Sequence, residues 1–182
     1  MNTFIPSSIK LINVLVFCEE WSTIMLPLQA RLTLHSSLVL PLIEFGDIVW
    51  GDKNNSTLMD LQILQNKAAK IIIDHHPRSS ATEALDSLAW KPLHLRRRFH
   101  RCITIFKRLN GFTDFSCHLI TNSLVHTCNT RHKNDLHLPR VRTNWDKQHV
   151  FYHGVTDWNV LSQETGDTSS QCYFKANLKR EL

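Results

Sequence analysis

Residues 93–109 have the sequence LHLRRRFHRCITIFKRL and carry the clearest helical pattern of the chain. At about 100° per residue, the angular step of an α-helix, the apolar side chains fall on one continuous stripe. The stripe comprises Leu95, Phe99, Cys102, Ile103, Phe106 and Leu109. Asn110 and Gly111 follow at the usual position of a helix C-terminal cap. The pattern predicts a helix over 93–109 that buries one face in a core.

The cations of this helix are expected outside the stripe. Helical spacing sets Arg97, Arg101 and Arg108 opposite the apolar face, with Arg96 and Lys107 on one flank and Arg98 on the other. No Asp or Glu occurs between Asp86 and Asp114, so no acid nearby in the sequence neutralises them. Arginine also suits phosphate, because its planar fork donates two parallel hydrogen bonds. The helix is therefore a candidate polyanion-binding face, although a charged helix face is often only solvated.

Further helices are expected on both sides of this one. Pro27 fits the first turn of a helix that Pro41 ends or kinks. Ser56 or Thr57 fits the N-cap of a helix over 58–73. The core face of that helix would comprise Leu61, Leu64, Ala68, Ile71 and Ile72. Another helix is expected to begin near Ala81, and residues 172–182, CYFKANLKREL, predict a final amphipathic helix.

These patterns predict a mainly α fold, a helical bundle with a short extended or β-hairpin segment toward the C-terminus, formed by 136–142 and 150–152. Only five glycines and six prolines interrupt the 182 residues, which favours helices over short strands. The predicted organisation is a helix in 1–26, a helical core region with the basic helix in 27–111, and an irregular basic region with short strands and a terminal helix in 112–182.

Composition bounds the class of protein. A net charge of +5 and 42% hydrophobic residues predict a globular chain with one core. The five cysteines include no C-x-x-C pair, which indicates a reduced, intracellular protein of the nucleus or cytoplasm. Residues 21–43 are apolar, but Arg31 and two prolines interrupt them, so no membrane association is predicted.

A second basic stretch follows the helix, and the aromatic residues Trp145, Phe151 and Tyr152 interleave with its end, as base-stacking platforms would. The alternative is that these aromatic residues pack inward. The cations of the stretch include Lys147. The nucleic-acid-binding residues predicted from both stretches are Arg96, Arg97, Arg98, Arg101, Lys107, Arg108, Arg131, Lys133, Arg140 and Arg142.

Motifs of catalysis and metal binding are missing from the sequence. It contains no phosphate-binding glycine loop, no nucleophile elbow and no two adjacent aspartates, so no catalytic residue and no cofactor is predicted. Six candidate zinc ligands lie between residues 117 and 137, but their spacing matches no zinc-finger pattern. They are Cys117, His118, His126, Cys128, His132 and His137. A metal is therefore not predicted, and a small zinc-binding module is kept as an alternative.

A series of segments carries a resemblance to a known family. In order they are LVLPLIEFGDIVWG, LQILQNKAAKIII, ATEALDSLAWKPLHLRRR, FKRLNG, NTRHKNDLHLPRVRTN and HGVTDWNVLS. The series resembles the region after the polymerase palm in non-LTR (LINE-type, jockey-like) retrotransposon reverse transcriptases, over about 27–182. The resemblance implies that the helix predicted in 1–26 derives from the thumb of such a polymerase. The matching positions are Leu40, Leu61, Leu64, Trp90, Arg96, Arg97, Thr130, Arg131, Trp158 and Asn159.

The resemblance implies binding rather than catalysis. The parent enzymes copy RNA into DNA with paired aspartates that hold two metal ions, and without such carboxylates two-metal chemistry cannot proceed. The expected function is a non-catalytic C-terminal fragment of an RNA-directed DNA polymerase. Its expected partners are RNA or an RNA/DNA hybrid and the polymerase body of a related element. The alternatives are a helical interaction or scaffold remnant with no nucleic-acid partner, or the zinc module.

Overall fold

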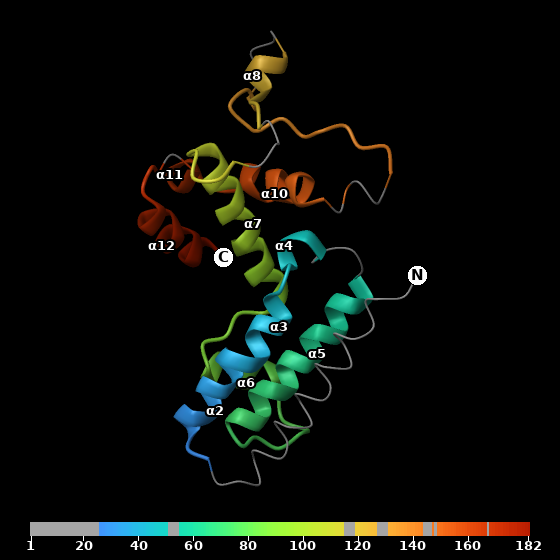
Figure 1. Cartoon of the computed structure of the whole chain (residues 1–182), viewed down its shortest axis with the longest axis vertical. Coiled ribbons are helices and arrows are strands. Elements are labelled where there is room, and N and C mark those ends of the chain that lie inside the picture. Colours follow the sequence, from blue (N-terminus) through green and yellow to red (C-terminus); the bar gives the residue numbers. More distant parts are fainter. Residues whose placement is uncertain are drawn as a thin grey trace. The chain divides into compact units, whose positions relative to one another are not determined.

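The computed structural model describes most of the chain as helices joined by loops (Figure 1). The residues described are 26–50, 55–114, 119–126, 131–143, 147, 149–166 and 168–182. Within them the only bridge of β type is an isolated antiparallel one between Thr121 and Leu136. The prediction of a mainly α fold is confirmed. The helix predicted within 1–26 lies outside the described residues, apart from Leu26.

The predicted hairpin is wrong. Residues 150–152 begin helix α10 (Val150–Asn159), and the side chain of His149 caps that helix by accepting a hydrogen bond from the Phe151 N–H. Residues 137–141 have no regular secondary structure and pair with no strand in the described part of the chain. The two segments of the predicted hairpin are therefore a loop and the start of a helix.

The chain divides into two compact units. Among the described residues the first comprises 26–47 and 55–93, and the second comprises 48–50 and 94–182. This division differs from the sequence-based boundary after Gly111, because helix α7 (Leu93–Leu109) packs on helices that follow it in the chain. The short helix α4 (Asp47–Trp50) lies where the chain passes from one unit to the other.

The first unit begins with a continuous helical segment made of α2 (Leu28–Leu34), the π-helix η1 (His35–Val39) and α3 (Leu40–Glu44). Pro41 was predicted to end or kink this segment, yet helix continues through it. The Leu40 N–H donates to the carbonyl of His35, five residues back, so the turn before the proline is wide. Such a widened turn relieves the clash between a proline ring and the preceding turn. Gly46, with φ 66°, then breaks the helix.

The long helix α5 (Asn55–Ile72) forms the core of the first unit with α3 and α6 (Ala81–Ser87). It begins three residues before the predicted start at 58, so Ser56 and Thr57 lie inside the helix and not at its N-cap. Its predicted apolar face is confirmed. Leu58, Leu61, Leu64 and Ile71 pack against the buried Val39, Ile43 and Leu93, while Ala69 packs with Ala84 and Leu85 of α6.

Two glutamines of α5 hold the chain before the basic helix. Gln62 Oε1 accepts the N–H of Leu93 at 2.8 Å, and Gln65 Nε2 donates to the carbonyl of Lys91 at 3.1 Å. The ring of Trp90 stacks on the buried His35, with centroids 4.2 Å apart. These contacts satisfy backbone groups on either side of Pro92, in the loop before the proline and at the first residue of α7.

The segment Leu28–Val49 is long and apolar enough to cross a membrane, although only 17% of its most apolar window is buried, and core helices of soluble proteins pass the same criterion. Arg31 lies within it and is used inside the first unit. Its guanidinium donates to both carboxylate oxygens of Asp74, at 2.6 and 2.7 Å, and to the carbonyls of Leu26 and Ile71.

The second unit is built around α7. On one side Cys102 and Phe106 pack with Phe174 and Leu178 of α12 (Gln171–Glu181), and the two phenylalanine rings stack with centroids 4.2 Å apart. On another side Ile105 packs with Leu136 and with Val155 of α10. The short helices α8 (Asn122–Val125) and α11 (Gln163–Gly166) complete the unit. The predicted C-terminal helix is confirmed. The predicted apolar stripe is confirmed except at Leu109, which is 41% exposed, and α7 is buried on more than its stripe.

The Arg31–Asp74 pair predicts a pH dependence of stability. Hydrogen bonding from Arg31 is the main reason that the pKa of Asp74 is lowered from its ordinary value. The folded state therefore binds fewer protons than the unfolded chain, so stability is gained above the unfolded pKa of about 3.9 and lost as pH falls through the folded pKa. We expect Asp74→Asn to lower the urea midpoint slightly at pH 7 and to leave it unchanged at pH 2.

The control is Asp86→Asn, which alters an exposed acid of α6. A difference between Asp74→Asn and the parent chain that persists at pH 2 would contradict the assigned ion pair. Because Asp74 is exposed, the effect at pH 7 should be small.

The crossing of α7 and α10 predicts a size limit at Gly154. A Cβ at this position would lie 3.0 Å from Cγ1 and 3.2 Å from Cδ1 of Ile105. We expect Gly154→Leu to lower the free energy of unfolding by about 1–3 kcal/mol through overpacking. Thr156→Leu places the same side chain at an exposed position of α10 and should change stability little. Urea unfolding followed by circular dichroism measures both, and equal stability of the two variants would contradict the close crossing.

Candidate nucleic-acid interface

Two of the three arginines predicted to lie opposite the apolar stripe of α7 are buried. Arg97 is 5% exposed and Arg101 is 8% exposed. Arg101 Nε donates to Asp157 Oδ2 at 2.6 Å, and Arg98 Nε lies 3.5 Å from Asp157 Oδ1. The expectation that Arg97 and Arg101 form an exposed polyanion-binding face is therefore wrong. Their side chains belong to the interior of the protein.

The reason is a carboxylate from a distant part of the sequence. Asp157 lies on α10, 56 residues after Arg101, so a search for acids near the basic helix could not find it. The same face of α7 also buries Thr104 and Ile105. Burial of a guanidinium is costly unless a carboxylate pairs with it. Asp157 supplies that partner.

Cys102 lies beside this ion-pair cluster and is fully buried. Burial is the main reason that the pKa of its thiol is raised to about 12, and the charge of Asp157 adds to the increase. Since the thiolate is the reactive form of cysteine, Cys102 is protonated and unreactive at neutral pH. It contributes to packing only.

The remaining predicted cations of α7 are partly exposed. They are Arg96, Lys107 and Arg108. Arg96 and Arg108 already take part in interactions within the chain. The helix therefore offers a smaller cationic surface than the sequence indicated.

The predicted cations after the helix are all exposed. Residues 131–142 form what we call the cationic segment, and Arg131, Lys133, Arg140 and Arg142 project from it. None of the four has an ion pair within the part of the chain that the structure describes. A charge that keeps its hydration and has no internal partner can exchange its counterions for phosphates.

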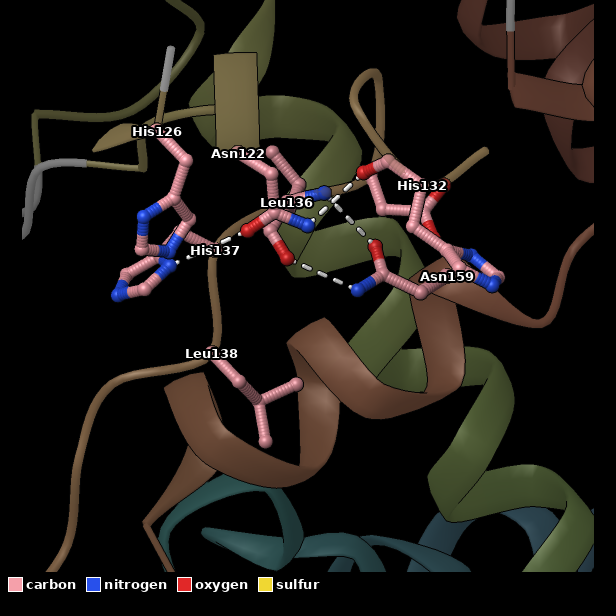
Figure 2. Close-up of a pocket in the computed structure, with 8 residues that line it drawn as sticks. Asn122, His126, His132, Leu136, His137, Leu138 and Asn159 are labelled. Carbon is pink, nitrogen blue, oxygen red and sulfur yellow. Dashed lines mark hydrogen bonds and ion pairs between the residues drawn. The ribbon is translucent and has the colours of Figure 1, made fainter. Parts of the chain in front are cut away.

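Hydrogen bonds fix the backbone of the cationic segment in place. Asn159, at the end of α10, accepts the N–H of Leu136 at 3.0 Å and donates to the carbonyl of Leu136 at 2.9 Å (Figure 2). Asn122 of α8 donates through Nδ2 to the carbonyl of His132 at 2.9 Å. The His137 N–H donates to the carbonyl of Ile120 at 2.7 Å. The buried Leu136 side chain anchors the same point in the core.

An open pocket of about 480 Å³ lies against this fixed backbone. Figure 2 shows its lining, which comes from α8, from the cationic segment and from the end of α10. The lining residues are Asn122, His126, His132, Asp135, Leu136, His137, Leu138 and Asn159. The rings of His126 and His137 meet edge to face, with centroids 6.0 Å apart.

The alternative of a small zinc-binding module is not supported by any ligand cluster among the described residues. Among these, no group of three or more potential ligands is arranged to hold a metal ion. Figure 2 shows His126 and His137 at one side of the pocket and His132 at the other, where His132 Nδ1 lies 2.6 Å from Asp135 Oδ2. Cys117, His118 and Cys128, the other candidate ligands, lie outside the described residues.

The aromatic residues expected to stack on bases have different environments. Phe151 packs against the core formed by Ile105, Leu136 and Val155. Tyr152 is partly exposed, and its ring meets that of His153 edge on. Trp145 lies outside the described residues. Phe151 is therefore a core residue, in agreement with the alternative that it packs inward.

Positions that carry the family resemblance serve packing and backbone support. Leu61 and Leu64 pack on the core of the first unit, and Trp90 stacks on His35. In the second unit Trp158 packs against Phe174, and Asn159 holds Leu136. In the sequence, Asn159 was only one of the positions that carry the resemblance. Its role in holding the backbone was not evident there, because its partner Leu136 lies 23 residues earlier. No local signal could have assigned that role.

Comparison with known proteins gives no relative: no family model matches the chain, and neither a curated protein nor a solved structure matches it.

The Arg101–Asp157 pair predicts a large loss of stability on neutralisation of one partner. Asp157→Ala leaves the buried guanidinium of Arg101 without its carboxylate, and breaking such a pair costs about 3 kcal/mol or more. Asp135→Ala removes an acid paired with the exposed His132 and should cost less than about 1 kcal/mol. Urea unfolding at pH 7 measures both. Similar losses in the two variants would contradict a buried, structural pair.

Proposed function

We propose that this chain binds nucleic acid through the cationic segment, as the non-catalytic region that follows the palm in a polymerase resembling non-LTR retrotransposon reverse transcriptases. The observation that carries the proposal is the set of four exposed cations on a backbone held at Leu136 by Asn159. A fixed backbone limits the entropy lost when a ligand binds. The partner class is RNA or an RNA/DNA hybrid.

The basic helix takes a different part in this proposal from the one its sequence indicated. Arg97 and Arg101 are interior residues, and Arg98 lies near Asp157, so these three support the fold. In this proposal the phosphate groups contact Lys107 and the cationic segment. Binding then rests mainly on counterion release, which makes it strongly dependent on salt.

The family assignment is supported by how two of the resembling segments meet. The segments around Leu136 and around Asn159 are separate in the sequence, yet the amide of Asn159 joins them through two hydrogen bonds. The two segments thus have a structural reason to occur together in this chain. The chain has no adjacent aspartates to hold two metal ions, so the proposal assigns it no polymerase chemistry.

A second candidate function is docking on a protein without nucleic acid. It is favoured by large apolar side chains exposed on the first unit, where Phe45 is 82% exposed and Met59 is 69% exposed. Exposed apolar side chains mark an interaction site when they form one contiguous patch, which is what this candidate requires. The polymerase body of a related element is the partner that the resemblance implies. A folded chain that binds no nucleic acid would favour this candidate.

The proposal predicts how affinity changes with charge and salt. We expect simultaneous replacement of Arg131, Lys133, Arg140 and Arg142 by Gln to weaken binding to single-stranded RNA. The slope of log K against log salt should become shallower by about 0.7 for each phosphate that the variant no longer binds. Fluorescence anisotropy across a salt series measures both quantities, after circular dichroism has confirmed that the variant is helical.

A matched control removes four positive charges elsewhere. Lys67, Arg78, Lys175 and Arg180 lie outside the cationic segment, so their replacement by Gln gives the same net charge. This control should keep most of the affinity and the parent slope. Equal losses in the two variants would indicate non-specific attraction, and no binding by the parent chain would overturn the proposal.

A further inference from the structure

The pocket in Figure 2 has a polar wall with defined hydrogen-bonding groups. Asn122 Nδ2 donates to the carbonyl of His132, which fixes its Oδ1 as the acceptor facing His137 Nδ1 at 3.1 Å. His137 therefore carries its proton on Nδ1, and in the neutral ring Nε2 is a hydrogen-bond acceptor. This is an arrangement that can accept from the exocyclic amine of a nucleobase.

The pocket also offers flat and apolar surface. The imidazoles of His126 and His137 lie at 68° to one another, and Leu138 adds an aliphatic side chain to the lining. Histidine is among the side chains on which unpaired bases stack in RNA-binding proteins. A volume of about 480 Å³ falls in the range of small-ligand sites, so one aromatic base fits.

Phosphate-binding groups continue from the pocket along the same chain. Lys133 lies between the lining residues His132 and Asp135, and Arg140 follows the lining residue Leu138 by two positions. Arg142 follows two residues later, and the side chains of both arginines are exposed. A strand whose phosphates follow these cations passes the mouth of the pocket.

We propose that this pocket receives one unpaired base of a single-stranded nucleic acid, while the cationic segment holds the neighbouring phosphates. The inference rests on the proposed nucleic-acid binding and adds the form of the ligand. Bases inside a duplex are stacked and paired, so they cannot enter a side pocket without being unstacked. The chain therefore prefers single strands to duplexes of equal length.

The test compares four ligands of the same length with the full chain: single-stranded RNA, single-stranded DNA, an abasic single strand and duplex DNA. The two base-containing strands should bind more tightly than the abasic strand at equal salt, and the duplex should bind more weakly than the single strands. A 2-aminopurine placed in the strand should change its fluorescence on binding. If RNA binds more tightly than DNA, the chain also contacts the 2′-hydroxyl. If the two strands bind equally, the base is the part of the nucleotide that the pocket recognises.

Variants of the pocket separate this inference from the proposed function. His126→Ala and His137→Ala should weaken binding to base-containing strands by roughly fivefold or more and leave abasic binding unchanged. His126 is exposed, so its replacement leaves the fold intact even if His137→Ala does not. His75→Ala removes an exposed histidine of the first unit and is the matched control.

The outcomes are distinct. Equal affinity for abasic and base-containing strands, together with unchanged binding by His126→Ala, would overturn the pocket inference and leave salt-dependent nucleic-acid binding in place. Absence of binding to every strand by the folded chain would overturn both. Loss of affinity confined to base-containing strands in the pocket variants would support the inference.

Discussion

The second unit depends on the ion pair between Arg101 and Asp157. An arginine buried in a helix-packed interior must meet a carboxylate, since an unpaired buried guanidinium would cost several kcal/mol. This requirement fixes where α10 crosses α7, and Gly154 permits the close approach at Ile105. Asp157 and Asn159 are two residues apart on α10, so their side chains point to different sides of the helix. One side chain meets α7, and the other holds Leu136 of the cationic segment.

The cations of the chain are consequently divided between two tasks. Arg101, which is buried, and Arg98, which is partly exposed, lie beside the carboxylate of Asp157, and they support the fold. The cations of the cationic segment are exposed. In the proposed function, attraction to nucleic acid depends mainly on this second group, because a guanidinium paired with a carboxylate releases few counterions.

The hydrogen bonds that hold the backbone of the cationic segment also shape the pocket beside it, which is the proposed site of base recognition. Asn122 and Asn159 hold the segment through its carbonyls and an N–H, and the same arrangement orients His137 at the pocket wall. Side chains that are fixed before binding lose little entropy when a ligand arrives. In the proposed function, the cationic segment therefore acts as a defined surface for nucleic acid.

Local sequence patterns were sufficient to predict the helical class, the apolar stripe of α7, the core face of α5 and the exposure of the cations in residues 131–142. The helical features follow from the periodic spacing of apolar residues, and the exposure of the cations follows from the absence of such spacing in a polar loop. Both are set by residues that are close together in the sequence. The burial of Arg97 and Arg101, the helical state of residues 150–152, and the roles of Asp157 and Asn159 emerged only in the folded chain. Each depends on packing or on a partner supplied from a distant part of the chain, as with the 56 residues between Arg101 and Asp157. A helical pattern gives the angle of a side chain about the axis, but what packs against that angle is set by the rest of the fold.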